Sequence, residues 1–172
     1  MSGTKRSLRA FIAVGSNLGA RVSNCKRAVS MVDESPGVDC LSRSSLYETA
    51  PVGINSQRPF VNGVFEVRTT LGPLDLLDVL LEVEKQMGRD RSQGPDRVID
   101  LDLLNMEGVT RQPDERSDLE LPHPRLADRD FVLVPWAEIA PDVVVEGLGK
   151  TVRELLECLS SLESVIRKVE EL

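Results

Sequence analysis

Residues 60–104 read FVNGVFEVRTTLGPLDLLDVLLEVEKQMGRDRSQGPDRVIDLDLL, and this stretch decides the fold. Apolar residues alternate over 60–70, which predicts a half-buried strand. Leucine and valine then recur at helical spacing over 73–88, between a proline in the first turn and a glycine at the end. Residues 98–104 are short and apolar and predict a second strand. The stretch is therefore a strand–helix–strand unit.

A second unit of the same kind precedes this stretch. AFIAV at 10–14 predicts a buried strand, residues 20–34 predict a helix, and residues 37–49 predict another strand. We expect Ser16 or Asn17, in the turn after the first strand, to cap the helix. The order strand–helix–strand–strand–helix–strand predicts an α+β fold, the ferredoxin-like split βαβ sandwich. Its sheet would be mainly antiparallel, with the helices packed on one face.

The C-terminal part of the chain predicts one more helix. Thr151 and Glu154 fit a capping box, and apolar residues continue at helical spacing from Val152 to Val169. We therefore expect a C-terminal helix over about residues 150–171 that packs on the domain. The sequence contains no repeat and no obvious linker, so the whole chain is expected to form a single domain, 1–172.

The overall charge limits the classes of partner. The chain has 172 residues and a net charge of -7, from 21 basic and 28 acidic residues. Non-specific nucleic-acid binding needs a basic surface, so we expect no nucleic-acid partner. The apolar run AFIAV is too short for a signal peptide or a membrane span, and the three cysteines lack metal-site spacing. These features predict a cytoplasmic protein with reduced thiols and no membrane partner.

Two aspartates interrupt the apolar strand at 98–104. Asp100 and Asp102 are two positions apart, so in a strand they point to the same face, with Cα atoms about 6–7 Å apart. One interpretation is a solvent-facing strand edge with two ordinary charges. The other is a divalent-metal site, because Mg²⁺ prefers carboxylate oxygens and commonly binds substrate phosphates as well.

Cationic residues surround these aspartates in the sequence. Arg89, Arg91 and Arg97 precede them, and Arg129 follows. A guanidinium group can donate two hydrogen bonds to one phosphate, although the same arginines could simply pair with aspartates in an exposed loop. His123 is the only histidine, and a lone histidine is more often a structural hydrogen-bonding residue than a catalyst. Beside a phosphate it could donate a hydrogen bond or assist a proton transfer.

Aromatic residues are sparse, at 3% of the chain. Phe60 and Phe131 both fit core packing, but Phe60 shares a strand face with Asn62. An aromatic ring beside a carboxamide suits a flat heterocycle, which needs stacking together with a hydrogen-bond donor and acceptor.

Taken together, these motifs resemble the 6-hydroxymethyl-7,8-dihydropterin pyrophosphokinase family of folate biosynthesis. The matching stretches, in the family's order, are FIAVGSNLG (11–19), SSLYETAPVG (44–53), PFVNGVFEV (59–67), EKQMGRDR (84–91), RVIDLDLL (97–104) and LPHPRLADRDFVLVPWAEIAPD (121–142). The resemblance implies a ferredoxin-like fold. It also implies transfer of pyrophosphate from ATP to the hydroxymethyl group of the reduced pterin, with release of AMP and use of two Mg²⁺ ions.

The same resemblance implies roles for individual residues. Those implied for catalysis and phosphate contact are Arg89, Arg97, Asp100, Asp102 and His123, with the two aspartates as ligands of both metal ions. The implied pterin site comprises Thr49, Val52, Phe60, Asn62 and Phe131, with the two phenylalanines on either side of the ring. The implied ATP site comprises Glu84, Arg91, Leu103, His123 and Arg129. The expected partners are these small-molecule substrates, and the expected assembly is a monomer or weak dimer.

One loop departs from the family pattern. Members often carry Arg-Trp-Gly-Pro-Arg before the metal-binding strand, whereas this chain has SQGPDR at 92–97, with Asp96 between Pro95 and Arg97 and no tryptophan. The lid is therefore expected to close differently. A non-catalytic pterin- or nucleotide-binding relative with an altered lid loop is the alternative function. A structural protein that interacts through its C-terminal helix is a third.

Overall fold

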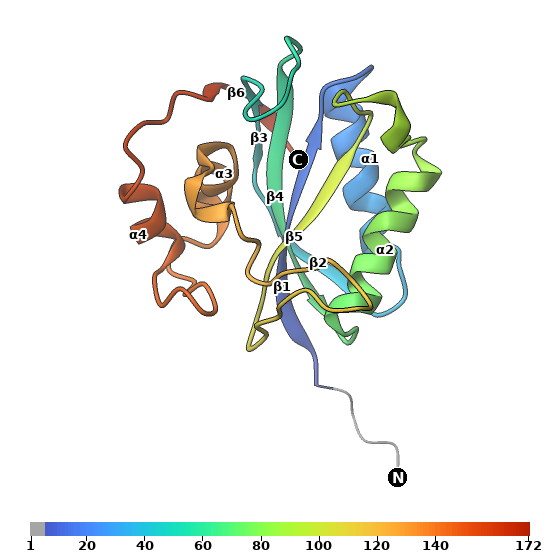
Figure 1. Cartoon of the computed structure of the whole chain (residues 1–172), viewed down its shortest axis with the longest axis vertical. Coiled ribbons are helices and arrows are strands. Elements are labelled where there is room, and N and C mark those ends of the chain that lie inside the picture. The colour runs from blue at the N-terminus through green and yellow to red at the C-terminus, as the bar shows by residue number, and fades with distance from the viewer. Residues whose placement is uncertain (1–5) are drawn as a thin grey trace.

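The computed structural model describes residues 6–172. It contains a six-stranded sheet with strand β4 (Phe60–Thr69) in the middle (Figure 1). The other strands are β1 (Leu8–Ser16), β2 (Val38–Arg43), β3 (Ser45–Thr49), β5 (Asp100–Met106) and β6 (Val165–Glu171). The strand order is β5-β1-β4-β3-β6, with β2 also paired to β4, and all of these pairs are antiparallel. The single strand expected over 37–49 is divided at Ser44, whose hydroxyl accepts a hydrogen bond from Val64 N (2.9 Å).

Helices α1 (Arg21–Asp33) and α2 (Pro73–Gln86) make the two crossover connections. α1 joins β1 to the parallel strand β2 with β4 between them, and α2 joins β4 to the parallel strand β5 with β1 between them. These split βαβ units confirm the predicted ferredoxin-like arrangement. The expected cap of α1 is wrong, because its N-cap residue is Ala20 and makes no side-chain hydrogen bond. Asn17 instead bonds to the loop between α2 and β5.

Helices cover both faces of the sheet, and the prediction of a single covered face is wrong (Figure 1). α1 and α2 pack on one face, while α3 (Asp130–Ile139) and α4 (Val152–Glu157) pack on the other. The reason lies in β1, where the adjacent residues Phe11 and Ile12 point to opposite faces and both are buried. Single 3-10 turns occur at Arg91–Gln93 and Leu126–Asp128. None of the helices within 6–172 is both long and apolar enough to cross a membrane.

The predicted C-terminal helix over 150–171 is also wrong. The capping box of Thr151 and Glu154 is present and begins α4, but this helix ends at Glu157. The chain then returns to the sheet, where β6 pairs antiparallel with the edge of β3. Ser164, just before β6, donates its main-chain N–H to the buried carboxylate of Asp130 (2.8 Å). The unpaired edge of β3 thus gains hydrogen-bond partners that a helix could not supply.

Candidate active site

A cleft of about 290 Å³ opens where strands β1, β3, β4 and β5 meet the loops around them. The strands contribute polar side chains at their ends, and two loops complete the walls: the β3–β4 loop (residues 50–59) and the α2–β5 loop (residues 88–98). Most of the predicted site residues line this cleft, namely Thr49, Val52, Phe60, Asn62, Arg89, Arg91, Arg97, Asp100, Asp102, His123, Arg129 and Phe131. The fold therefore brings together positions that lie up to about half the chain apart.

Asp100 and Asp102 project from β5 into the cleft, and the leucines that alternate with them are buried on the opposite face. Opposite them on β1 are Gly15 and Ala13, whose small size leaves the space in front of the carboxylates open. The Asp102 side chain is 40% exposed but lies deep between the cleft walls. That burial, together with the nearby negative charge of Asp100, raises the pKa of Asp102 to about 6. A bound cation would remove the repulsion between the two carboxylates.

Arginines contact both carboxylates. Arg97 Nη2 lies 2.8 Å from Asp100 Oδ2, and Arg89 Nη2 lies 3.4 Å from Asp100 Oδ1. Arg129 Nη1 lies 4.0 Å from Asp102 Oδ2. The Nε atoms of Arg89 and Arg97 are buried and have no hydrogen-bond partner within residues 6–172. Because buried N–H groups are normally paired, these two atoms suit an anionic ligand in the cleft.

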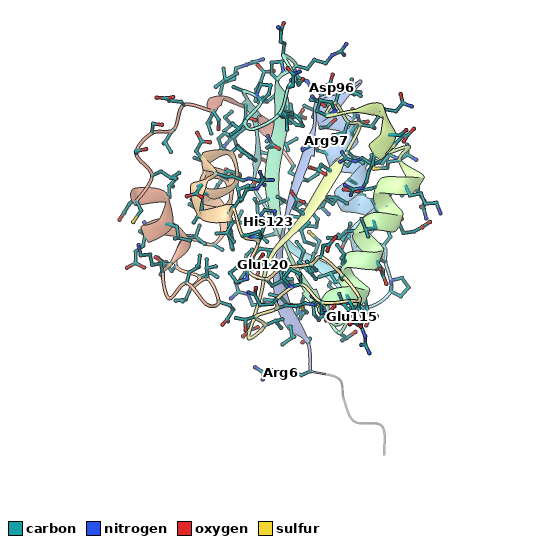
Figure 2. The ribbon with its side chains drawn as sticks, in the orientation of Figure 1. Arg6, Asp96, Arg97, Glu115, Glu120 and His123 are labelled. Carbon is teal, nitrogen blue, oxygen red and sulfur yellow. The ribbon has the colours of Figure 1, made fainter. Side chains whose placement is uncertain are left out.

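His123 also lines the cleft, on the segment that leads to α3, and is labelled with Arg97 in Figure 2. Its Nδ1 accepts a hydrogen bond from Arg125 N (3.2 Å), so Nε2 carries the proton in the neutral ring. Burial and the positive charges of Arg129 and Arg125 lower the pKa of His123 to about 4. The imidazole is therefore neutral near pH 7, with one N–H available as a donor.

The part of the cleft around Asn62 has the features of a site for a flat ring. Asn62 Nδ2 donates to Thr49 Oγ1 (2.6 Å), which fixes the plane of the carboxamide. Gly15 is the partner of Asn62 on the neighbouring strand β1, and a Cβ at this position would clash with Asn62 Oδ1. Phe60 and Phe131 flank this region, and arginines lie over their rings. Arg97 Cζ is 5.0 Å from the centre of the Phe60 ring, and Arg129 Cζ is 5.5 Å from that of Phe131.

The sequence that builds this cleft matches the model of a known protein family. The model of 7,8-dihydro-6-hydroxymethylpterin-pyrophosphokinase (HPPK) matches residues 11–141, which include every residue that lines the cleft. The chain belongs to this family. The stretches that carried the resemblance in the sequence are thus part of a family-wide match.

Curated relatives agree with this assignment. The Methylorubrum extorquens protein named 2-amino-4-hydroxy-6-hydroxymethyldihydropteridine pyrophosphokinase is 44% identical over 161 residues, which cover 91% of this chain and 98% of the relative. A Bacillus subtilis protein of the same name is 40% identical and covers 80% of this chain and 81% of the relative. The fission yeast Schizosaccharomyces pombe protein named folic acid synthesis protein fol1 is 35% identical, but this chain spans only 20% of its length.

Solved structures share the fold of this HPPK family member. One structure of Plasmodium falciparum HPPK-DHPS matches with a TM-score of 0.72 and 17% sequence identity. The match covers 91% of this chain and 45% of that chain, so the chain spans less than half of the Plasmodium falciparum protein. At this identity the similarity supports the α+β fold alone.

Two residues implied for the ATP site of this HPPK family member do not line the cleft. Glu84 is buried at the end of α2, where it accepts from Leu101 N (2.7 Å) and pairs with Arg91 (2.9 Å). Burial raises the pKa of Glu84, and this contact with Leu101 N opposes the rise. The side chain of Leu103 is 2% exposed and packs in the core under α1 and α2. Glu84 is therefore connected to the cleft through its partner Arg91, whereas Leu103 does not line the cleft.

The structure also adds residues that sequence reasoning did not place in the site. Arg125 lines the cleft, and its position two residues after His123 in a Pro-rich segment was the available signal. Gly15 was visible only as part of a turn motif, because its role depends on the facing residue Asn62. The contacts of Asn17 depend on a loop about 80 residues away and had no local signal.

Proposed function

We propose that this chain transfers the pyrophosphoryl group of ATP to the hydroxymethyl group of 6-hydroxymethyl-7,8-dihydropterin, with AMP as the second product. The observation that carries the proposal is one cleft in which a paired carboxylate, five arginines and a ring-binding pocket meet. Family membership and the names of the relatives support the same reaction.

The two aspartates are the proposed magnesium ligands. Asp100 and Asp102 supply hard oxygen atoms on one face of β5, and no third histidine, cysteine, aspartate or glutamate completes a metal cluster within residues 6–172. Phosphate oxygens and water would therefore provide the remaining ligands, which is the usual way in which proteins bind Mg²⁺. The family resemblance implies two ions, which would neutralise charge on the transferred group.

The arginines are the proposed phosphate contacts. Asp100 is paired with Arg89 and Arg97, and a metal ion on this carboxylate would replace those contacts. Metal binding to the carboxylate would release both guanidinium groups to bind phosphate oxygens. Arg129 would act in the same way beside Asp102.

His123 is a proposed donor and not a general base. Its Nδ1 already accepts Arg125 N, and its low pKa keeps Nε2 protonated and neutral near pH 7. The ring can then donate one hydrogen bond to a phosphate oxygen. In the proposed reaction the hydroxymethyl oxygen bonds to the β-phosphorus of ATP and loses its proton to water, while the bond between that phosphorus and the α–β bridging oxygen breaks and AMP leaves with that oxygen. The protein mainly positions the two substrates and neutralises charge.

The pterin would bind between Phe60 and Phe131. Asn62, oriented by Thr49, would hydrogen-bond the edge of the heterocycle, and Val52 on the β3–β4 loop would cover it. Arg91 and Glu84 would lie near the nucleotide, and Leu103 would contribute through its main chain. The cytoplasmic location, the single domain and the monomer or weak dimer stay predictions.

The decisive experiment is to incubate the protein with ATP, Mg²⁺ and 6-hydroxymethyl-7,8-dihydropterin and to measure AMP by chromatography. We expect AMP only when all three are present, with omission of the pterin and addition of EDTA as controls. Absence of AMP with saturating substrates would contradict the enzyme function. Binding of ATP and pterin without AMP would instead support the non-catalytic relative with an altered lid loop.

A further inference from the structure

The Asp96 carboxylate lies where three loops of the molecule meet. Its Oδ1 accepts hydrogen bonds from Ser56 Oγ (2.5 Å) and from Asn17 Nδ2 (2.7 Å). Its Oδ2 lies 3.4 Å from Arg58 Nε. The partners come from the β3–β4 loop and from the turn between β1 and α1, while Asp96 itself belongs to the α2–β5 loop. Figure 2 shows Asp96 at the upper end of the molecule, with Arg97 below it.

Polar contacts of this kind are the main interactions that hold these two loops together. None of the residues 50–59 and 88–98, all of which the structure describes, is buried. Apolar packing therefore does little to fix the two loops relative to each other, although both form walls of the cleft. The Asp96 side chain is itself 31% exposed, so water can replace its partners when the contact opens.

The same junction fixes the main chain of Arg97. Arg97 N donates to Asn17 Oδ1 (2.7 Å), and Asn17 N donates to Arg97 O (3.1 Å). The Arg97 guanidinium then lies over the Phe60 ring and contacts Asp100. The Arg97 side chain thus contacts the proposed ring-binding pocket and the strand of the proposed metal ligands. Its main chain is held by Asn17, which also binds the neighbouring carboxylate of Asp96.

We propose that Asp96 is a positioning residue whose carboxylate latches the β3–β4 loop to the α2–β5 loop over the bound pterin. Asn17 is the strand end of the latch, because it directly follows β1, and Ser56 and Arg58 on the β3–β4 loop are the other end. The proposal rests on the proposed function, since the latched state is the one that encloses both substrates. The residue that departs from the family loop pattern would thereby supply a closing contact of this chain's own.

Steady-state kinetics test the latch against a matched control. Asp90 is an exposed aspartate of the same α2–β5 loop, but among residues 6–172 its carboxylate bonds only within that loop, to Ser92 and Gln93. Loss of the latch lowers the populated fraction of the closed site, so Asp96→Ala should raise the KM for the pterin about 3- to 10-fold with kcat within about 2-fold. Asp90→Ala should change either constant by less than about 2-fold. Asp96→Asn retains an acceptor oxygen and should restore most of the affinity.

Hydrogen exchange followed by mass spectrometry tests the same contact without activity. Asp96→Ala should accelerate amide exchange about 3- to 10-fold in the peptide that covers residues 50–58, far from the substitution in sequence. Asp90→Ala should leave that peptide unchanged. Ser56→Ala removes the other side of the contact and should accelerate exchange in residues 88–98. It also replaces Asp96→Ala as the test if that variant does not fold.

The outcomes separate the latch from the proposed reaction. Equal pterin KM values and equal exchange in Asp96→Ala and Asp90→Ala would overturn the latch. A lower melting temperature of Asp96→Ala with unchanged KM and unchanged exchange at 50–58 would show a merely structural aspartate. If the unmodified protein forms no AMP, the proposed function fails, and the exchange experiment alone then decides whether Asp96 joins the two loops.

Discussion

The cleft has a strand-borne half and a loop-borne half, and they are built by different means. Asp100, Asp102 and Asn62 project from strands whose opposite faces are packed in the core. The loop-borne half consists of residues 50–59 and 88–98, none of which is buried, and the two loops are joined through partly exposed polar groups. The groups proposed to bind the metal ions and the pterin ring, which need a fixed geometry, thus lie on strands anchored in the core. Groups that must let substrates enter lie on segments that separate at low energetic cost.

The largest expected effect tests the strand-borne half. Asp100→Asn or Asp102→Asn should lower kcat/KM by about 10³-fold or more, because each removes a carboxylate from the proposed metal site. The far-ultraviolet circular dichroism should be unchanged.

Stability provides an internal control for Asp102. Its raised pKa means that ionisation above about pH 6 opposes folding, so Asp102→Asn should increase the free energy of unfolding at pH 7. The free energy of unfolding should increase by about 1 kcal/mol. This is less than the full pKa shift would give, because the Asp102 side chain is partly exposed and water screens its charge. Near-normal activity, or a stability loss of several kcal/mol, would contradict the assignment.

The next effect tests the ring-binding part of the strand-borne half. Asn62→Ala should lower kcat/KM for the pterin by about 10²-fold, because polar atoms of the heterocycle would lose their partners on binding. Thr49→Val removes only the group that orients the amide and should cost about 10-fold. Initial rates at varied pterin and varied ATP concentration measure both effects. An equal rise in the KM for ATP would contradict the assignment of Asn62 to the pterin site.

A pH effect of intermediate size tests His123, between the two halves. Its folded-state pKa of about 4 lies below the ordinary value of 6.5, so the unfolded chain binds more protons between these pH values. This contribution to stability is fully present above pH 6.5 and is lost as the pH falls toward 4.

The comparison of unmodified protein with His123→Gln isolates this contribution from that of Asp102, which has the opposite sign. The free energy of unfolding of the unmodified protein should fall by about 2 kcal/mol more than that of the variant between pH 6.5 and pH 4.5. Urea unfolding at a series of pH values provides the measurement. If the free energies of unfolding of the two proteins changed with pH in parallel, His123 would be solvated and its pKa would not be lowered.

The smallest expected effect concerns a residue outside both halves of the cleft. Thr151→Ala removes the N-cap of α4, where Thr151 Oγ1 accepts from Glu154 N (3.2 Å), and should lower the free energy of unfolding by about 1 kcal/mol. Neither KM should change, because Thr151 does not line the cleft. A change in pterin KM would show that α4 and α3 transmit motion to Phe131, and the division into two halves would then be incomplete.

Several features of the protein were determined by the sequence itself. The alternation in β4, the helical spacing in α2 and the paired aspartates of β5 are local patterns. β4 and α2 begin where predicted, and β5 begins at Asp100, two residues later than the predicted strand. The motifs also indicated most of the cleft, because strand ends in this fold converge on one point.

Only the tertiary structure decided the remaining features. The apolar residues after Leu159 fit a helix or a strand, and the open edge of β3 made them the strand β6. The second layer of helices depends on burial of both faces of β1. The role of Asp96 depends on partners 40 and 79 positions away, Ser56 and Asn17, which no local pattern connects to it. Local periodicity fixes an element, whereas contacts between distant segments are set by how the elements pack.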